Sequence, residues 1–472
     1  MKSIRKTLLV LSVLTLLLTG GCSSQNIENT FSTEDKEEQL TYAETVSNTV
    51  YSPSSQEDTA ETESVSDPDP VSESESVAEP EPVPESESVA EPEPVPEPEP
   101  FPEYDITLMA VGDNLMHMGV VYTGKQTDGS FDYSCLYEGI SEFLENADIK
   151  IINQETILGG NERGFSGYPY FNSPTEVGDA IAQAGFNVVL HASNHAADQG
   201  TEGLIACADF WDKYPDVLMT GIYADKEKAG EIPLLTIDNI TFAILNYTYG
   251  PNMEILPKSL EGHINLLCDY DANTNQMDFT TLNPNVLTDI QKAEKLADVV
   301  IVCPHWGIEY VTQPSGYQQE FAMQMTEAGA DLIIGTHPHV VQPIEWITAG
   351  NGNRALCFYS LGNYVSTQKD GLSMLEALAW VTFHVDENGF AISEDKTGAI
   401  PLVCHYTSNP VRIQRIYLLE DYTAEQATSH GIHSYGGVNL TLEDLTTWDK
   451  EILGDWVLSK EQLVNQSHSE FQ

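Results

Sequence analysis

Five apolar stretches of the sequence each end in a compact group of residues whose side chains can bind a metal ion or move a proton. In α/β sheets, ligands bind beyond the carboxyl ends of the strands, so groups that follow successive strands tend to meet in space. One polar residue after a strand is commonly just the start of a loop, whereas five such groups indicate one shared site. The groups are Asp113-Asn114, Asn153 to Glu155, Asn194-His195, His305 and His337-Pro338-His339.

These groups offer imidazole nitrogens together with carboxylate and amide oxygens, and they contain no thiolate. Such a set suits Mn, Fe or Zn better than a sulfur-rich site would, and the imidazoles make calcium a poorer match. Two ions about 3.5–4 Å apart can activate a water molecule and clamp a phosphoryl oxygen. The sequence therefore predicts a site for divalent metal, with two ions, that is suited to hydrolytic chemistry.

The spacing within the groups predicts how the ligands divide. His337 and His339 are two residues apart. On an extended segment stiffened by the intervening proline, both imidazoles would point to one side, and each can bind one of two neighbouring metals. A carboxylate such as Glu155 can bridge two cations, and Asn194 offers a neutral carbonyl oxygen. His195 follows directly and is expected to point elsewhere, which leaves it free as a proton donor.

Strand-like runs alternate with helical patterns over the region that carries these groups. Strands separated by helices indicate an α/β sheet, and antiparallel-looking hairpins at 232–250, turning at Asp238-Asn239, and at 340–366 indicate that the sheet is mixed. Strands are expected over 106–113, 149–156, 187–195, 298–307 and 331–339, and helices over 133–146, 175–186, 201–214, 287–297 and 318–328.

The first 22 residues have the pattern of a bacterial export signal. Three basic residues precede an apolar run over 8–18, which is too short to span a bilayer. The run leads to Leu-Thr-Gly-Gly-Cys at 18–22, which resembles a lipoprotein signal whose cysteine receives the lipid and becomes the new N-terminus. We expect lipidation of Cys22. An ordinary secretory signal with a chance cysteine is the alternative, and both place the mature protein outside the cytoplasm.

Residues 23–103 lack hydrophobic periodicity and predict a disordered acidic linker. The segment 73–84 (ESESVAEPEPVP) is repeated identically at 85–96, and residues 26–103 contain 23 acidic residues and 1 basic residue. Alternating Glu and Pro favours extended polyproline II conformations, and such a segment cannot bury enough apolar surface to offset the entropy of ordering. We expect a solvated stalk that lifts a domain away from the membrane. A cation-binding or partner-binding tail is the alternative.

The balance of charge excludes one class of partner. The 472-residue chain has 20 Lys and Arg against 73 Asp and Glu, a formal net charge of -53. Nucleic-acid binders neutralise phosphates with clustered Lys and Arg, so we expect no nucleic-acid partner. The hydrophobic fraction of 41% is nevertheless enough for a substantial core.

Longer strings around the polar groups carry a family resemblance. In chain order they are AVGDNLMH, INQET, SPTEVGDAIAQAGFNVVLHASNHAADQGTEGL, CPHWGIEYVTQPSGYQQEFAMQMTEAGADLIIGTHPHVVQPIE and YSLGNYV. They resemble the capsule-synthesis protein A (CapA) family, named for poly-γ-glutamate capsule biosynthesis, whose domain is similar to the calcineurin-like metallophosphatases. The resemblance covers residues 104–366 and implies an α/β fold of layered mixed β-sheets flanked by helices. Residues 367–472 carry no matching string and are expected to form a C-terminal extension packed on that domain.

The resemblance also implies a role for each candidate ligand. The implied ligands are Asp113, Glu155 and His339 for one metal and Glu155, Asn194, His305 and His337 for the other, with Glu155 as the bridge. His195 matches the histidine that acts as general acid or stabilises the transition state.

The first motif departs from the metallophosphatase pattern. Metallophosphatases have Asp-x-His there, whereas position 115 is Leu. Asn114 and His117 are the candidates to substitute, and capsule-family members commonly lack that histidine. Asn153 is a further accessory candidate, and Asn363 is expected to hydrogen-bond a loop near the site rather than to bind metal.

Two functions fit this sequence. We expect a surface-anchored protein of capsule (poly-γ-glutamate type) or cell-envelope polymer biosynthesis, with a metal-dependent phosphoesterase-like hydrolase site in which His195 protonates the leaving oxygen. The alternative is a non-catalytic, lipid-tethered accessory subunit of a membrane polymer synthase or exporter, which the missing histidine and the acidic stalk favour.

The expected partners and location follow from these two functions. The partners would be the membrane, through the N-terminal lipid, a membrane polymer-synthase complex, and an anionic polymer or phosphoester substrate. The expected location is the outer face of the bacterial cytoplasmic membrane, at the cell surface. Because residues 104–472 contain 50 acidic and 16 basic residues, contact with a polyanion would require metal ions between them.

Overall fold

A computed structural model describes residues 102–467 of the chain, with side chains as far as residue 463. The predictions for the export signal, for lipidation of Cys22 and for nearly all of the linker lie outside the described residues. Within the described part, no helix is long and apolar enough to cross a membrane.

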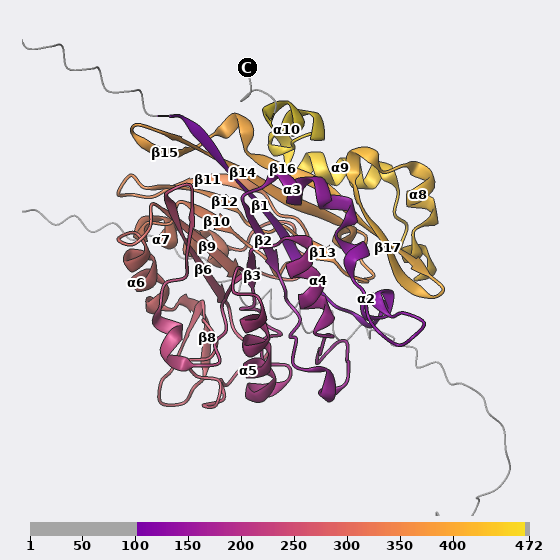
Figure 1. The fold of residues 1–472 in the computed structure, drawn as a ribbon, viewed down its shortest axis with the longest axis horizontal. Coiled ribbons are helices and arrows are strands. Elements are labelled where there is room, and N and C mark those ends of the chain that lie inside the picture. Colours follow the sequence, from indigo (N-terminus) through magenta and orange to yellow (C-terminus); the bar gives the residue numbers. More distant parts are fainter. Residues whose placement is uncertain (1–101, 468–472) are drawn as a thin grey trace, which may run out of the picture. The chain divides into compact units, whose positions relative to one another are not determined.

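The larger of the two main sheets has nine strands, and β1 (Tyr104–Asn114) lies in its middle (Figure 1). β2 (Ile149–Asn153), β3 (Val188–Leu190) and β4 (Leu218–Thr220) follow on one side, each parallel to its neighbour. β2 and β3 are almost fully buried and mostly apolar, as expected for parallel strands covered on both faces. Their carboxyl ends therefore lie along one edge of the sheet.

The other half of this sheet comes from the C-terminal part of the chain. β14 (Leu375–Asp386) pairs antiparallel with β1, and β16 (Gly398–Ser408) and β17 (Val411–Leu418) continue the sheet outward. β15 (Gly389–Ile392) pairs with the end of β14. Residues 367–472, which we expected as an extension packed on the domain, thus supply four strands of the sheet itself.

The second main sheet has six strands and is also mixed. Its inner strands are parallel, whereas its two edge strands are antiparallel to their neighbours. The hairpins expected at 232–250 and 340–366 are confirmed, and Asp238-Asn239 form the first turn with φ of 45° and 71°. The strand order is β11 (Ile344–Thr348), β12 (Arg354–Phe358), β10 (Leu332–Ile334), β9 (Val299–His305), β6 (Ile240–Thr248) and β5 (Leu234–Ile237).

The two sheets pack against each other through apolar side chains. The ring of Phe242 on β6 meets the ring of Phe383 on β14 edge-on, with centroids 5.3 Å apart. Both rings are fully buried. The predicted fold class, an α/β arrangement of layered mixed sheets flanked by helices, is confirmed. A separate two-stranded sheet is formed by β7 (Cys268–Tyr270) and β8 (Met277–Leu282).

Helices flank the sheets, and local signals set several of their ends (Figure 1). α7 begins with a capping box between Ser315 and Gln318 and ends at Gly329, whose φ is 117°. The described helices are α2 (Met118–Gly124), α3 (Ser141–Asn146), α4 (Glu176–Ala184), α5 (Gly200–Phe210), α6 (Pro284–Ala293), α7 (Gly316–Ala328), α8 (Ala424–Ser429), α9 (Leu442–Ile452) and α10 (Lys460–Ser467).

Several predicted helices differ from the structure in their ends or in their continuity; the helix expected over 201–214, for example, ends at Phe210. The segment 133–146 is not one helix but two short 3-10 turns followed by α3. Gly139, in the second of these turns, lies so close to β17 that a Cβ there would stand 2.0 Å from the carbonyl oxygen of Ile416, so this close approach requires glycine. α6 starts three residues earlier than predicted, because Asn283 caps it and Pro284 occupies its first turn.

Candidate metal centre

The predicted ligands meet where the carboxyl ends of strands from both sheets converge. Asp113 lies near the end of β1, Glu155 follows β2 by two residues, and His305 ends β9. His337 and His339 follow β10. All five residues are at most 3% exposed. The strands thus bring side chains that are far apart in sequence into one buried cluster.

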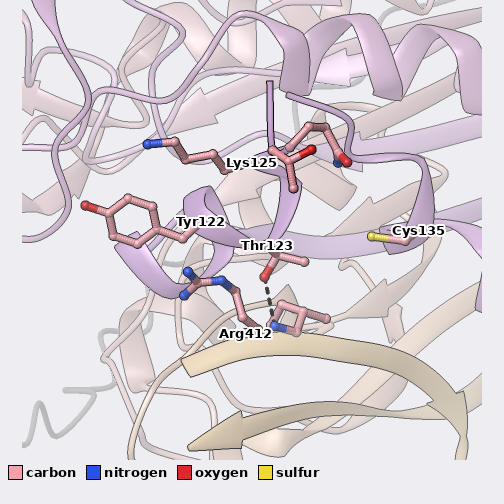
Figure 2. A pocket seen from close by; sticks show the side chains of 8 residues that line it. Tyr122, Thr123, Lys125, Cys135 and Arg412 are labelled. Carbon is pink, nitrogen blue, oxygen red and sulfur yellow. Dashed lines mark hydrogen bonds between the residues drawn. The ribbon is translucent and has the colours of Figure 1, made fainter. Parts of the chain in front are cut away.

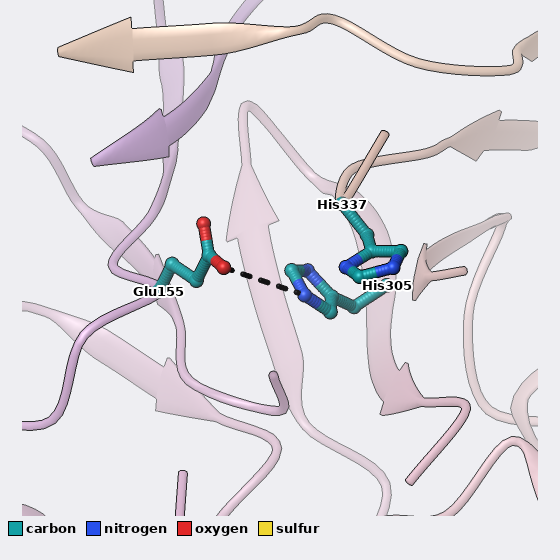
Figure 3. Close-up of side chains that lie close together, drawn as sticks. All are labelled: Glu155, His305 and His337. Carbon is teal, nitrogen blue, oxygen red and sulfur yellow. Dashed lines mark ion pairs between the residues drawn. The ribbon is translucent and has the colours of Figure 1, made fainter. Parts of the chain in front are cut away.

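Glu155 lies at the centre of the cluster. Its Oε1 is 3.9 Å from Nε2 of His305, and its Oε2 is 3.8 Å from Nδ1 of His339. Figure 3 shows the carboxylate turned toward the His305 ring, with His337 beyond it. Burial, together with the nearby Asp113 carboxylate, raises the pKa of Glu155 well above its usual value. Among the described residues, neither carboxyl oxygen has a hydrogen-bond partner.

A divalent cation fits this arrangement. A buried charged group is costly unless it is paired, and here the carboxylate oxygens face imidazoles at distances too long for hydrogen bonds. A cation bound between them would supply the missing partner. The residues present therefore fit the metal that the ligand chemistry of the sequence predicts.

Three groups of side chains bring their ligand atoms within 4.8 Å of one another. They are Glu155, His305 and His337; Asp113, Glu155 and His339; and Glu309, His337 and His339. The first two groups share Glu155, which is the geometry that a bridging carboxylate requires. The third contains Glu309, which the sequence analysis missed although it lies only four residues after His305 in the string HWGIEY.

The imidazoles differ in their electrostatic surroundings. Burial lowers the pKa of His305 and of His337 well below the usual value, and the neighbouring histidines act in the same direction. Both rings are therefore neutral, which is the form that binds a metal. Burial also acts to lower the pKa of His339, but the charge of Glu155 and a hydrogen bond to Asp113 outweigh it and raise the pKa to about 10.

The segment that carries His337 and His339 is not extended, so that prediction is wrong. Both residues have positive φ, 98° and 57°, and form a tight turn. Their rings lie 5.9 Å apart, so they still face a common region. The carbonyl of Pro338 accepts a hydrogen bond from the backbone N–H of Tyr310 at 2.8 Å. This bond ties the turn to the loop that follows β9.

Amide side chains orient Asp113 and His339. Asn153 donates to Oδ1 of Asp113 at 2.7 Å, while Oδ2 of Asp113 lies 3.0 Å from Nδ1 of His339. Asn363, on β13 (Asn363–Val365) beside β1, places its Oδ1 3.1 Å from the same Nδ1 and donates to Oε1 of Gln368 at 2.8 Å. Asn153 and Asn363 thus hold ligands in place, and Gln368 is a further contributor that the sequence analysis missed.

Asn194 and His195 approach the cluster from the loop after β3. Oδ1 of Asn194 lies 2.9 Å from Nε2 of His305. His195 directs Nε2 toward Glu155, 4.0 Å from Oε1, while its Nδ1 lies 2.8 Å from Oδ2 of Asp198. Phe171 packs edge-on against the His195 ring, at a centroid distance of 4.7 Å. Both adjacent residues thus direct an atom toward the cluster, so the prediction that His195 points elsewhere is wrong.

Of the two candidates to replace the missing first-motif histidine, His117 belongs to none of the three ligand groups found among the described residues. Asn114 donates to Oε1 of Gln154 at 2.6 Å. His117 is partly buried and packs against Phe171, with ring centroids 5.5 Å apart, and desolvation lowers its pKa to about 3.

An open surface depression lies elsewhere, between α2 and β17 (Figure 2). The guanidinium of Arg412 lies 5.1 Å from the ring centre of Tyr122, and Thr123 accepts a hydrogen bond from the backbone N–H of Ile413 at 2.9 Å. Lys125 and Cys135 also line it, and none of the predicted ligands does. The candidate metal centre is thus separate from this depression.

Comparison with known proteins gives a consistent assignment. The family described as bacterial capsule synthesis protein PGA_cap matches residues 107–368. The capsule biosynthesis protein CapA of Bacillus anthracis is 29% identical over 296 residues, which are 61% of this chain and 66% of that protein. The PGA biosynthesis protein CapA of Bacillus subtilis (strain 168) is 32% identical over 206 residues, 43% of this chain and 48% of that protein. The matched regions thus span just under two thirds and about half of these relatives.

Among solved structures, a hypothetical protein from Thermus thermophilus has a TM-score of 0.34 and 12% identity, covering 63% of this chain and 99% of its own. The family match, by contrast, extends over more than half of the chain and includes every strand end that contributes to the metal centre. This chain belongs to the bacterial capsule synthesis protein PGA_cap family.

Proposed function

We propose that this chain is a metal-dependent, phosphoesterase-like hydrolase that acts in the synthesis of a capsule or of another cell-envelope polymer. The observation that supports this most strongly is the buried carboxylate of Glu155, which is shared by two ligand groups and lies close to the neutral imidazoles of His305 and His337. A structural ion pair would have an Arg or Lys opposite such a carboxylate. Several imidazoles lie opposite Glu155 instead, and such a set of ligands is typical of a metal site.

The residues divide between two cations, for which Mn, Fe or Zn are the candidates. Asp113, Glu155 and His339 would hold one, and Glu155 would reach a second held by Asn194, His305 and His337. When bound, such ions supply Lewis acidity toward a phosphoryl oxygen and lower the pKa of water. The described part of the chain contributes the buried surroundings that keep bulk water from weakening these interactions.

His195 supplies the proton in this mechanism. Its Nδ1 is held by Asp198, so Nε2 faces the metal centre, where the leaving oxygen of a phosphoester would lie. Phe171 limits rotation of the ring. The imidazole then donates a proton from Nε2 to the leaving oxygen, and the Asp198 carboxylate stabilises the orientation.

The proposed location is the outer face of the cytoplasmic membrane. Lipidation of Cys22 would anchor the protein, and the acidic linker would separate the folded part from the bilayer. The names of the two Bacillus relatives, which refer to capsule and PGA biosynthesis, support a role in polymer synthesis. An anionic polymer or a phosphoester would be the substrate, and a membrane polymer synthase would be the partner.

A non-catalytic role as an accessory subunit of a polymer synthase or exporter is the second candidate. Leu115 favours it, because this residue is 2% exposed and replaces a histidine that metallophosphatases use. In this case the bound metal would stabilise the structure, and the protein would not hydrolyse a substrate.

The test combines metal content with turnover. We would measure Mn, Fe and Zn in the purified chain by elemental analysis and assay a phosphomonoester and a phosphodiester with each ion. His195→Ala should abolish hydrolysis while keeping the metal, and His433→Ala, outside the metal centre, is the matched control. Metal without turnover, together with co-purification of a membrane synthase, would favour the accessory role. Absence of bound metal from the folded protein would contradict the hydrolase.

A further inference from the structure

We propose that Glu309 is a metal ligand of this site and takes the role of the histidine that Leu115 does not provide. This inference rests on the proposed function, since it presupposes that the site binds divalent cations. It assigns a residue outside the ligand set that the family resemblance implies.

The distances place Glu309 within reach of the metal ligands His337 and His339. A carboxyl oxygen of Glu309 and a nitrogen each of His337 and His339 lie within 4.8 Å of one another. Metal–ligand bonds of about 2.0–2.2 Å allow ligand atoms of one ion to be about 4.4 Å apart at most. A movement of a few tenths of an ångström by the side chains would thus bring the carboxyl oxygen of Glu309 onto the cation that His339 would hold, while His337 stays with the second cation.

His337 gives an independent indication of a ligand here. The residue is 3% exposed, and its Nδ1 has no hydrogen-bond partner within the described side chains, residues 102–463. Buried polar atoms are almost always paired, and an unpaired imidazole nitrogen next to two possible co-ligands marks a site for a cation.

The backbone conformation keeps Glu309 close to these histidines. Gly307 has a φ of 94° and Tyr310 a φ of 63°, so the chain turns sharply directly after β9. The N–H of Tyr310 then donates to the carbonyl of Pro338 at 2.8 Å. The loop that carries Glu309 is therefore attached to the turn that carries His337 and His339.

The side chain of Tyr310 also attaches this loop to the surroundings of the ligands. Its hydroxyl accepts a hydrogen bond from Gln368 at 3.1 Å, and Gln368 in turn accepts one from Asn363. Asn363 contacts His339. Glu309 thus lies on a loop that both the backbone and the side chain of Tyr310 attach to the surroundings of the ligands.

A glutamate ligand in place of a histidine ligand predicts which metal the site prefers. Exchanging a neutral imidazole for a carboxylate adds a negative charge and a hard oxygen to the ligand set. Hard oxygen ligands favour Mn over Zn, whereas imidazole suits Zn. Glu309 is half-buried, unlike the two histidines, so it would close the solvent side of the site.

The experiment measures Mn²⁺ binding to the whole purified chain by titration calorimetry, with elemental analysis for stoichiometry. Glu309→Gln is expected to lose one equivalent of Mn²⁺ or to bind it at least tenfold more weakly. Glu309→His, which restores a ligand atom, should recover the second equivalent and shift the preference toward Zn²⁺. Glu327→Gln, on the exposed face of α7, is the matched control and should bind as the unaltered chain does.

Each outcome has a defined meaning. Unchanged Mn²⁺ stoichiometry and affinity in Glu309→Gln would overturn the role of Glu309 while the proposed function stands. If Glu309→Gln lost Mn²⁺ binding and Glu309→His did not recover it, direct ligation by Glu309 would also be overturned. Only the negative charge of the carboxylate would then affect metal binding. If the unaltered chain bound no divalent ion, the inference and the proposed metal chemistry would fail together. Circular dichroism would establish that every variant is folded.

Discussion

Nδ1 of His195 lies 2.8 Å from Oδ2 of Asp198, three residues further along the chain. The same Oδ2 accepts a hydrogen bond from the backbone N–H of Phe171 at 2.7 Å, and the Phe171 ring packs edge-on against His195. One carboxylate thereby fixes both the orientation of the imidazole and the aromatic side chain that confines it. The arrangement leaves Nε2 of His195 as the nitrogen directed at Glu155.

Asp198→Asn should therefore reduce turnover without releasing metal. An amide in place of the carboxylate would no longer favour the orientation in which Nε2 faces the metal centre, and positioned acid–base catalysis contributes about 10²–10⁴-fold. We expect kcat for phosphoester hydrolysis to fall about 10- to 100-fold, with metal content unchanged by elemental analysis. Asp209→Asn, at an exposed position of α5, is the control. Loss of metal in Asp198→Asn would contradict this assignment.

Removal of the Asn363 side chain should weaken metal binding. Its Oδ1 lies 3.1 Å from Nδ1 of His339, and residues that orient a ligand typically affect affinity by about 10–100-fold. Asn363→Ala is expected to raise the Kd for Mn²⁺ by about tenfold in a calorimetric titration, while Asn388→Ala, in an exposed turn, should have no effect. An unchanged Kd would mean that Asp113 alone orients the imidazole.

Replacing Glu376 on β14 by methionine should stabilise the protein. Glu376 is fully buried, and within residues 102–463 neither carboxyl oxygen has a hydrogen-bond partner. Burial raises its pKa well above the usual value near 4.5. An apolar side chain of similar size removes an unsatisfied polar group, so we expect a gain of about 1–3 kcal/mol in the free energy of unfolding.

The gain in Glu376→Met should also depend on pH. Above about pH 4.5 the unfolded chain releases the proton of Glu376 while the folded chain keeps it, so the folded state binds more protons and the original protein loses stability as pH rises. The difference in free energy of unfolding, measured in urea at about pH 5 and about pH 8, should be larger at the higher pH. An equal difference at both values would show that burial leaves this carboxyl unperturbed.

His430 should make the fold sensitive to acid. Its Nε2 lies 2.9 Å from the carbonyl oxygen of Cys404, while its Nδ1 accepts from the N–H of Ile432 at 3.0 Å, an arrangement that only the neutral ring can form. Burial lowers its pKa from 6.5 to about 4. Between these two values the unfolded chain binds a proton that the folded chain does not, so stability is lost as pH falls through this range.

His430→Asn tests this directly. The plot of Tm against pH should be shallower between pH 6.5 and about 4 than for the original protein, with His433→Asn as the neighbouring control. Part of the slope should remain, because burial lowers the pKa of His405 to about 4 as well. Identical slopes in the variant and the original protein would contradict the role of His430.

The sequence predicted that side chains after several strands lie close together, because the signals for strand ends are local. An apolar run followed by a polar group marks the carboxyl end of a strand, and parallel strands align those ends, as Asp113 and Glu155 illustrate. Glu309 was missed because its position depends on a sharp turn and on a backbone hydrogen bond to Pro338, neither of which any local pattern indicates.

The pairing of strands that are far apart in the sequence was also not predicted. β14 lies far from β1 in the sequence, yet the two strands pair directly, from Tyr104 with Val385 to Val111 with Leu378. The apolar character of β14 indicates a buried strand but does not identify its neighbour. We expected a packed extension over 367–472 because these residues carry no sequence motif. Strand pairing does not depend on a motif, so this absence gave no information about the sheet.

This pairing has a practical consequence for producing the protein in shortened form. A recombinant fragment that stops at residue 368, where the family match ends, would lack β14 and leave one side of β1 without its hydrogen-bonding neighbour. β1 would then become an open apolar edge, which is the kind of surface on which chains associate. Such a fragment should aggregate on expression, and so fragment design for this protein has to follow the sheet and not the limits of the family match.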